Sequence, residues 1–250
     1  MRMRHAAGLV GLVVVGLAGS ASRARAGEIE WSGFQAGLQA GYGYAPRTWS
    51  LRVSGSDSIE DAQSEGLLPR EMKSTASAWM AGAFVGGSRQ EGPVVFGAEA
   101  AFAFSGLGSE ARVVRDTETP GLQVVTRVRE DVDWLGAARI QVGTAFGRAL
   151  VYGTGGLALG QVRLSGSIVT GENTAHEGVQ TDTVVGWTAG AGAWLALSRT
   201  VRLGGEMSYH DFGPRTFKLS PAHPLFEEES ARFDYRANGW NARLALAALF

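Results

Sequence analysis

The chain has 250 residues with a formal net charge of −1, and its 36 glycines against 7 prolines argue against a helical or a disordered protein. Because the chain has no cysteine, disulfides, thiolate metal sites and cysteine nucleophiles are excluded. The charge balance gives no sign of the basic patches that nucleic-acid-binding proteins carry, so no nucleic-acid partner is expected.

The first 26 residues have the features of an export signal. Arg2 and Arg4 precede an apolar run over 6–20, and the small residues Ala24 and Ala26 stand where signal peptidase reads the chain. The run is shorter than the ~20 apolar residues that a membrane-spanning helix needs. We therefore expect a signal peptide over 1–26, cleaved after Ala26, followed by a single domain over 27–250.

Beyond residue 27, charges or glycines interrupt every apolar run before it is long enough for a membrane helix. Any membrane span must then be a strand of a closed barrel, where apolar residues alternate with small or polar ones over ~10 residues. Eight segments fit this pattern: 31–43, 75–88, 96–104, 134–146, 150–164, 184–197, 201–209 and 240–250. The sequence predicts an all-β fold, an eight-stranded antiparallel transmembrane β-barrel.

Two of these segments leave open which residues face inward. In 75–88, Trp79 and Met80 lie on opposite faces of the strand, and both are apolar. In 150–164, Arg163 points inward only if Val151 does so too, because both positions have the same parity. In 184–197, the pattern places Trp194 inward.

The joins between the segments favour a membrane barrel over a soluble β-sandwich. Tight joins at 90–93, 147–148 and 198–200 alternate with long polar joins at 44–74, 107–127, 166–181 and 211–232. Outer-membrane barrels have short periplasmic turns and longer extracellular loops, whereas a sandwich has no reason to place every long loop at one end. We expect the four long joins to be extracellular loops.

Parity places six charged side chains inside the barrel. An eight-stranded barrel is narrow enough for side chains to fill it, and buried charges need partners. We expect a structural plug of paired charges, and the alternative is a small gated pore in which an arginine exchanges glutamate partners. The six residues are Glu99, Arg139, Arg163, Arg202, Glu206 and Arg243.

Short motifs along the chain carry a resemblance to a known family. They are WSGF at 31–34, GYG at 41–43, DWLG at 133–136, LVYGTGGLA at 150–158, GWTAGAG at 186–192 and DFG at 211–213. Together they resemble the small outer-membrane barrel antigens of Gram-negative bacteria, the opacity-protein-like and OmpA-type "porin family". The resemblance implies an outer-membrane location, contact with lipid and lipopolysaccharide, and a terminal Phe250 that the barrel-assembly machinery reads.

Further residues of the sequence bear on chemistry or on membrane contact. Ser208, His210 and Asp211 could suggest a lipid-modifying enzyme, but a triad is recognised by geometry and not by proximity in sequence. The histidines have no metal-ligand spacing, and the glycine clusters complete no phosphate-binding motif, so we expect no metal, cofactor or catalysis. The residues that suit aromatic girdles at the membrane surfaces are Trp31, Trp134, Trp187, Tyr209 and Trp240.

We therefore expect a barrel with a structural role in the envelope and a surface-exposed platform. A small channel for ions or solutes is the first alternative. The second is an adhesin or binding protein that contacts host or surface ligands through 44–74 and 211–232.

Overall fold

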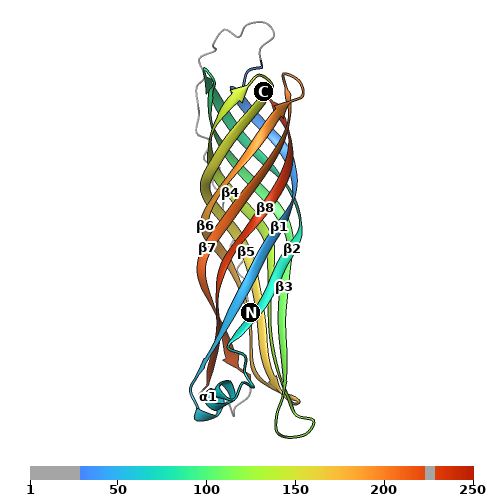
Figure 1. Cartoon of the computed structure of the whole chain (residues 1–250), viewed down its shortest axis with the longest axis vertical. Coiled ribbons are helices and arrows are strands. Elements are labelled where there is room, and N and C mark those ends of the chain that lie inside the picture. The colour runs from blue at the N-terminus through green and yellow to red at the C-terminus, as the bar shows by residue number, and fades with distance from the viewer. Residues whose placement is uncertain (1–28, 223–228) are drawn as a thin grey trace, which may run out of the picture.

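A computed structural model describes residues 29–222 and 229–250, which form a closed barrel of eight antiparallel strands (Figure 1). The elements are β1 (Gly33–Ser54), α1 (Asp57–Ser64), β2 (Glu71–Glu91), β3 (Val94–Asp116), β4 (Gln123–Phe146), β5 (Ala149–Thr170), β6 (Asn173–Ala196), β7 (Val201–Pro221) and β8 (Ser230–Leu249). Each strand pairs with its neighbours in sequence, and β1 pairs with β8 to close the ring. The predicted fold class is confirmed. The expected signal peptide and its cleavage site after Ala26 lie outside the described residues.

The joins between strands fall at opposite ends of the barrel. Three tight joins, at 92–93, 147–148 and 197–200, lie near the C-terminus, at what we call the inner end (Figure 1). Gly92 and Gly147 have φ angles of +62° and +59°, which favour glycine because it has no side chain. The opposite end, which we call the outer end, carries α1. In the described residues, no helix is long and apolar enough to cross a membrane.

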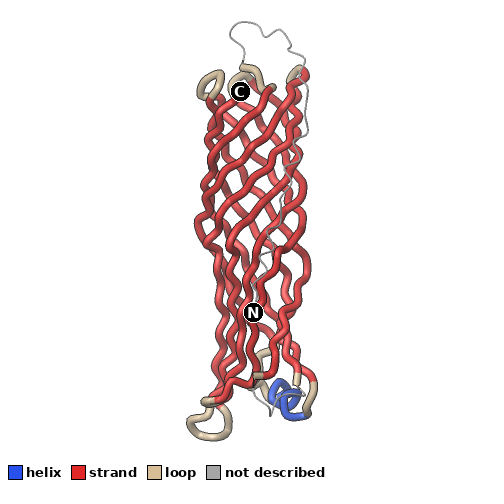
Figure 2. Tube along the Cα trace, turned by 180° about the vertical axis from the view of Figure 1, so that it is seen from behind, coloured by secondary structure: helices blue, strands red, loops and turns tan. Residues whose placement is uncertain are grey.

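The expectation of four long polar loops at the outer end is wrong. Most of 44–74, 107–127, 166–181 and 211–232 belongs to the strands, which run for 20 to 24 residues. The actual joins are 55–70 with α1, 117–122, 171–172 and 222–229. At ~3.3 Å per residue and a tilt of ~40°, a strand of this length reaches ~55 Å along the barrel, roughly twice the apolar band of such barrels. The outer half of the long tube in Figure 2 therefore projects beyond the bilayer.

The inner half of the barrel carries the face that contacts lipid. Leu38, Ile140 and Leu244 point outward there and are each about two-thirds exposed or more. Large apolar side chains exposed around a whole ring indicate a lipid surround. This face ends in a ring of aromatic residues, which we call the outer girdle: Tyr42, Tyr44, Trp79, Phe104, Trp134, Trp187, Tyr209 and Trp240.

At the outer girdle the two faces of each strand exchange polarity, and β8 is the clearest example. On the inner side of Trp240, Leu244 points outward and Arg243 points into the barrel. On the outer side, Arg232 points outward and Phe233 is fully buried. The strand keeps its period of two throughout, because only the solvent outside changes from lipid to water.

The outer half has a packed apolar interior. The Trp49 ring lies 6.4 Å from Phe233 and 4.4 Å from Tyr235, and Phe217 stacks on Phe233 at 6.5 Å between centroids. Helix α1 covers the end of this cluster, because its Ile59 is buried within it. We call this cluster the outer core.

A second apolar cluster fills the inner end of the barrel. Its members show which residues of β2 and β6 point inward. Phe84 and Trp194 are buried there with ring centroids 5.8 Å apart, so Trp194 points inward as expected. In β2, Met80 and Phe84 point inward and Trp79 points outward. Trp31 is fully buried in the same cluster, so its predicted place in an aromatic girdle is wrong. We call this cluster the inner core.

The backbone ladder is continuous through the lipid-facing half and interrupted beyond it. The β2–β3 ladder ends at Met80 and Ser105, next to the outer girdle. The β6–β7 ladder breaks beyond Trp187, and the β1–β8 ladder breaks beyond Tyr44 and Trp240. In lipid an unpaired backbone group costs several kcal/mol, whereas water can pair with it outside. The interruptions therefore mark where the surroundings become aqueous.

Replacing Phe217 by alanine should loosen the outer half, because truncating a fully buried phenylalanine costs ~3–5 kcal/mol. We expect the backbone amides of the outer parts of β7 and β8 to exchange hydrogen at least ~100-fold faster, at 1.4 kcal/mol per factor of ten. Val179→Ala is the matched control, since Val179 lies in the same half but is 76% exposed. Equal exchange in the two variants would contradict a packed outer core.

Candidate functional site

The inner half of the lumen holds a ring of four buried charges, which we call the lumen ring: Glu99, Arg139, Glu206 and Arg243. The strand register makes Glu99 the direct cross-strand partner of Arg139 on β3 and β4. On β7 and β8, Glu206 is likewise the direct partner of Arg243. The two pairs meet inside the barrel because each lies on the inward face of its strands.

The four side chains bond across the lumen as well as within each pair. Arg139 donates hydrogen bonds to both Glu99 and Glu206. Arg243 Nη2 lies 2.9 Å from Glu99 Oε1 and 2.8 Å from Glu206 Oε2. Two acids and two cations leave the ring with no net formal charge. This balance matters because an unpaired charge in a low-dielectric interior is strongly destabilising.

Neutral polar side chains use the remaining bonding positions of the ring. The Tyr152 hydroxyl donates to Glu206 Oε2 at 2.9 Å, and Gln141 Nε2 donates to Glu99 Oε2 at 3.3 Å. Arg243 also donates to the amide oxygen of Gln39. Each glutamate thereby accepts hydrogen bonds from three different side chains, which fixes the carboxylates in place.

The structure places the other two predicted lumen charges elsewhere. Arg202 is inward and buried but lies in the inner core, where its guanidinium sits 4.5 Å from the centroid of the Trp31 ring. Arg163 is exposed on the outside, so its predicted place in the lumen is wrong. On β5 the even-numbered Tyr152 and Val162 face inward, which turns every odd position outward. Arg163 lies on the outer side of the girdle, in water.

A second buried ion pair was not predicted from the sequence. Arg47 Nε lies 2.7 Å from Glu130 Oε2 in the outer half, with side chains 5% and 0% exposed. Arg47 also donates to the backbone oxygen of Asn238. Both charged residues fall outside the strand segments that we expected. The alternation of β1 could have predicted the inward position of Arg47, because the odd-numbered residues of this strand remain buried as far as Trp49 and beyond.

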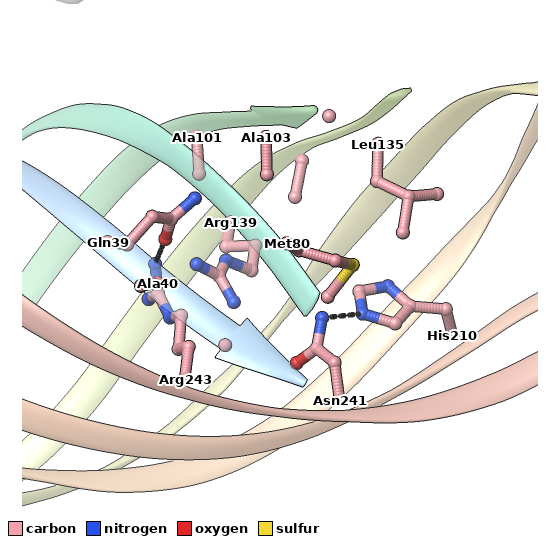
Figure 3. Close-up of a pocket in the computed structure, with 13 residues that line it drawn as sticks. Gln39, Ala40, Met80, Ala101, Ala103, Leu135, Arg139, His210, Asn241 and Arg243 are labelled. Atoms are coloured by element: carbon pink, nitrogen blue, oxygen red, sulfur yellow. Dashed lines mark hydrogen bonds between the residues drawn. The ribbon is translucent and has the colours of Figure 1, made fainter. Parts of the chain in front are cut away.

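A small cavity lies beside the lumen ring (Figure 3). It measures about 50 Å³ and is lined by Met80, Arg139, His210, Asn241 and Arg243 among others. One water needs ~10–15 Å³ on this measure, so a few waters fit but a solute of metabolite size does not.

Ser208, His210 and Asp211 do not form a catalytic arrangement. Asn241 Nδ2 lies 2.8 Å from His210 Nε2 (Figure 3). Ser208 Oγ donates to Asn241 Oδ1 at 2.7 Å, so the asparagine stands between the serine and the histidine. Asp211 pairs with Arg236 and accepts from the backbone N–H of Gly213. Successive residues of a strand point to opposite faces, so Asp211 cannot orient His210.

The histidine and acidic side chains of the described residues are the other candidates for chemistry. In 29–222 and 229–250, no group of three or more histidine or acidic side chains could hold a metal ion. In the outer half, burial lowers the pKa of His176 below its usual range, although the Glu229 carboxylate 3.9 Å away acts in the opposite direction. The neutral imidazole is therefore favoured, in keeping with an outer core that excludes water.

Comparison with known proteins identifies the family. The model of the outer membrane protein β-barrel domain matches residues 10–246. The chain belongs to this family. It is therefore an outer-membrane protein of a Gram-negative bacterium, as expected.

Relatives of the outer membrane β-barrel family support this assignment. The 31 kDa outer-membrane immunogenic protein of Brucella melitensis is 32% identical over 205 residues, which cover 81% of this chain and 80% of the Brucella protein. The 22 kDa outer membrane protein of Rhizobium leguminosarum bv. viciae is 31% identical over 138 residues, 54% of each chain.

Among solved structures, the outer membrane protein OprG of Pseudomonas aeruginosa superimposes with a TM-score of 0.53 at 11% identity, over 88% of this chain and 97% of OprG. The outer membrane protease OmpT of Escherichia coli gives a TM-score of 0.50 at 9% identity, over 87% of this chain and 97% of OmpT. At these identities the likeness concerns the fold alone.

Replacing Arg139 by methionine should destabilise the barrel by ~3–5 kcal/mol, because it leaves Glu99 and Glu206 buried with one cation between them. The free energy of unfolding in urea can be followed by the gel mobility of unboiled samples. Arg163→Met is the matched control and should change it little. Adding Glu99→Gln to Arg139→Met should recover part of the loss, and a further loss would contradict the charge balance of the ring.

Proposed function

We propose that this protein is a non-conducting barrel that contributes to the integrity of the outer membrane and carries a rigid projection on the cell surface. The observation that carries this proposal is the filling of the lumen in three successive layers. The inner core comes first, the lumen ring second and the outer core third. A solute that crossed the barrel would have to displace all three.

The nature of each layer supports a plug. The inner core contains bulky rings, including Phe84 and Trp194, which face one another across the lumen. The lumen ring has no net formal charge, and each of its carboxylates accepts hydrogen bonds from both arginines, so a passing ion finds no uncompensated charge in the ring to bind. The outer core is covered by α1. Interiors of eight-stranded barrels are just wide enough to be filled in this way.

A small channel is the first alternative, and it would require Arg139 to release one glutamate while the aromatic layers move. In planar bilayers we expect the purified protein to show no stable openings. Stable openings that disappear in Arg139→Ala or Glu99→Ala would contradict the proposal. Arg163→Ala is the control, because it removes an arginine from the aqueous outer surface and leaves the lumen unchanged.

Envelope integrity can be measured in cells. Deleting the gene should increase sensitivity to detergents and uptake of hydrophobic dyes, and the intact gene should restore both. An Arg163→Ala protein should restore them equally. Cells without the protein that kept an intact permeability barrier would contradict this role.

As part of the same proposal, the terminal Phe250, which is 81% exposed on the lipid-facing side, is read by the barrel-assembly machinery.

Surface binding is a second candidate, and the long outer half favours it. The outward positions there are polar and charged, and exposed ion pairs such as Arg127–Glu110 at 3.0 Å and Arg129–Asp131 at 2.8 Å cover it. The interior is packed, so this surface is held stiffly at a distance from the membrane. A rigid surface loses little conformational entropy when it binds a partner.

A further inference from the structure

The small cavity beside the lumen ring lies between two layers of the filled lumen. Arg139 and Arg243 of the lumen ring form part of its wall, and Met80 and Ala103, which also line it, belong to the outer core. In Figure 3, Ala103 and Leu135 lie on the opposite side of the labelled group from Arg243. We call this space the ring cavity.

The charged residues in the wall of the ring cavity are both cations. Arg139 and Arg243 line it, whereas Glu99 and Glu206 are not among the lining residues. The lumen ring has no net formal charge as a whole, but the part of it that meets the cavity is made by its arginines. A cation needs acceptor oxygens around it and an anion needs donors. The wall therefore favours an anion over a cation.

Arg139 leaves one of its donors unused. Its two terminal nitrogens donate to Glu206 and Glu99. Its Nε is buried and has no hydrogen-bond partner among the side chains and backbone of 29–222 and 229–250. A guanidinium in a protein does not lose its proton, so Nε remains a donor at every accessible pH. A buried donor of this kind is destabilising unless a partner is supplied.

His210 supplies a second unused donor to the same cavity, and it is only 8% exposed. Because Ser208 Oγ donates to Asn241 Oδ1, the amide nitrogen of Asn241 faces His210 Nε2, at 2.8 Å. An amide nitrogen can only donate, so Nε2 accepts and the neutral ring carries its hydrogen on Nδ1. Nδ1 is buried without a partner in the described part of the chain.

The amide oxygens in the wall are already used. Gln39 Oε1 accepts from Arg243, and Asn241 Oδ1 accepts from Ser208. A water molecule brings two hydrogens that need acceptors, whereas a halide ion only accepts. The apolar part of the wall, which includes Leu135, offers no further acceptor and lowers the local dielectric constant. An occupant without hydrogens therefore satisfies both unused donors and leaves no polar group of its own unpaired.

We propose that the ring cavity binds one monatomic, monovalent anion of the chloride class, held by Arg139 Nε–H and His210 Nδ1–H. The cavity measures about 50 Å³. A water needs ~10–15 Å³ on this measure, so there is room for one such ion with a water beside it. The ring has no net charge, so a second negative charge on the ion would be left uncompensated in a low-dielectric interior.

This inference goes beyond the proposed function and does not require a conducting lumen. Arg139 comes from β4 and His210 from β7, so a bound anion connects two strands that are not neighbours in the barrel. The ion lies between the lumen ring and the outer core, which cover it on both sides. Exchange with the solvent requires local opening of one of these layers, so the ion is best introduced while the protein folds.

The first test is the stability of the full-length barrel refolded in detergent with increasing sodium chloride. Sodium gluconate keeps the ionic strength constant, because gluconate is too large for the cavity. We expect the midpoint of urea unfolding to rise with chloride and to saturate, since a ligand that binds only the folded protein stabilises it. Bromide should act in the same way.

A matched pair of variants separates binding in the cavity from general effects of salt. His210→Met removes the Nδ1 donor and should weaken the apparent affinity for chloride at least ~10-fold, which corresponds to 1.4 kcal/mol. Thr188→Val is the control, because Thr188 is the direct cross-strand partner of His210 and is buried but does not line the cavity. It should keep the full response to chloride.

Bound bromide gives a direct measurement. After refolding in bromide and removal of free ions, we expect the unmodified barrel and Thr188→Val to retain bromide in an equimolar amount, and His210→Met to retain far less. In crystals grown from bromide, the anomalous signal of the ion should lie beside Arg139 Nε and His210 Nδ1.

Three results would overturn the proposal. They are equal urea midpoints in chloride and gluconate, equal responses of His210→Met and Thr188→Val, and a ring cavity that contains only water in crystals grown from bromide. If His210→Met does not fold, the position of bromide in the unmodified protein still decides the question.

Discussion

The structure depends on one constraint: a backbone that crosses lipid must pair all its N–H and C=O groups within itself. In the lipid-facing half, this requirement closes eight strands into a ring with uninterrupted ladders. Every register shift lies at or beyond the outer girdle, for example between Phe104 and Leu107 and between Val132 and Trp134. Backbone pairing is therefore uninterrupted on the lipid-facing side of the outer girdle, and register shifts occur only at the girdle or beyond it.

The narrowness of the ring leads to the second feature, a filled lumen. Side chains that point inward have nowhere to go except against one another, so their charges must balance and their polar atoms must find partners. The lumen ring meets this demand with two cross-strand pairs. The inner and outer cores are mainly apolar, with Arg202 against the Trp31 ring in the first and Arg47 paired with Glu130 in the outer half. These layers fill successive levels of the lumen along the described part of the barrel.

The barrel fold, the number of strands and five of the six inward charges follow from the period of two alone. The errors have physical causes. The prediction of Arg163 in the lumen fails because β5 is apolar on both faces, so its pattern does not show which face is inward. The pattern predicts loops in the outer halves of the strands because the polarity of the two faces is inverted there. A strand that is polar outside and apolar inside, as around Phe233, does not match the pattern of a membrane-spanning strand, which is apolar outside.

Trp31 shows a different limit. Tryptophan suits both a membrane interface and an apolar core, and the choice here depends on Arg202, which comes from a strand far along the chain and lies against its ring. The Arg47–Glu130 pair likewise joins positions 83 residues apart, and Glu130 lies in β4 beyond the segment that the pattern predicted. Such contacts can be predicted only when it is known which strands face each other across the barrel. The residue pattern of one strand does not contain that information.

The arrangement of the lumen ring has a consequence for how the barrel enters the membrane. Glu99 and Arg139 belong to the hairpin of β3 and β4, and Glu206 and Arg243 belong to that of β7 and β8. Each hairpin brings one acid and its cation side by side on neighbouring strands. Each acid of the lumen ring thus has its cation within its own hairpin, whether or not the other hairpin has arrived. The charges of the ring are paired locally, and the contacts across the lumen require the closed ring.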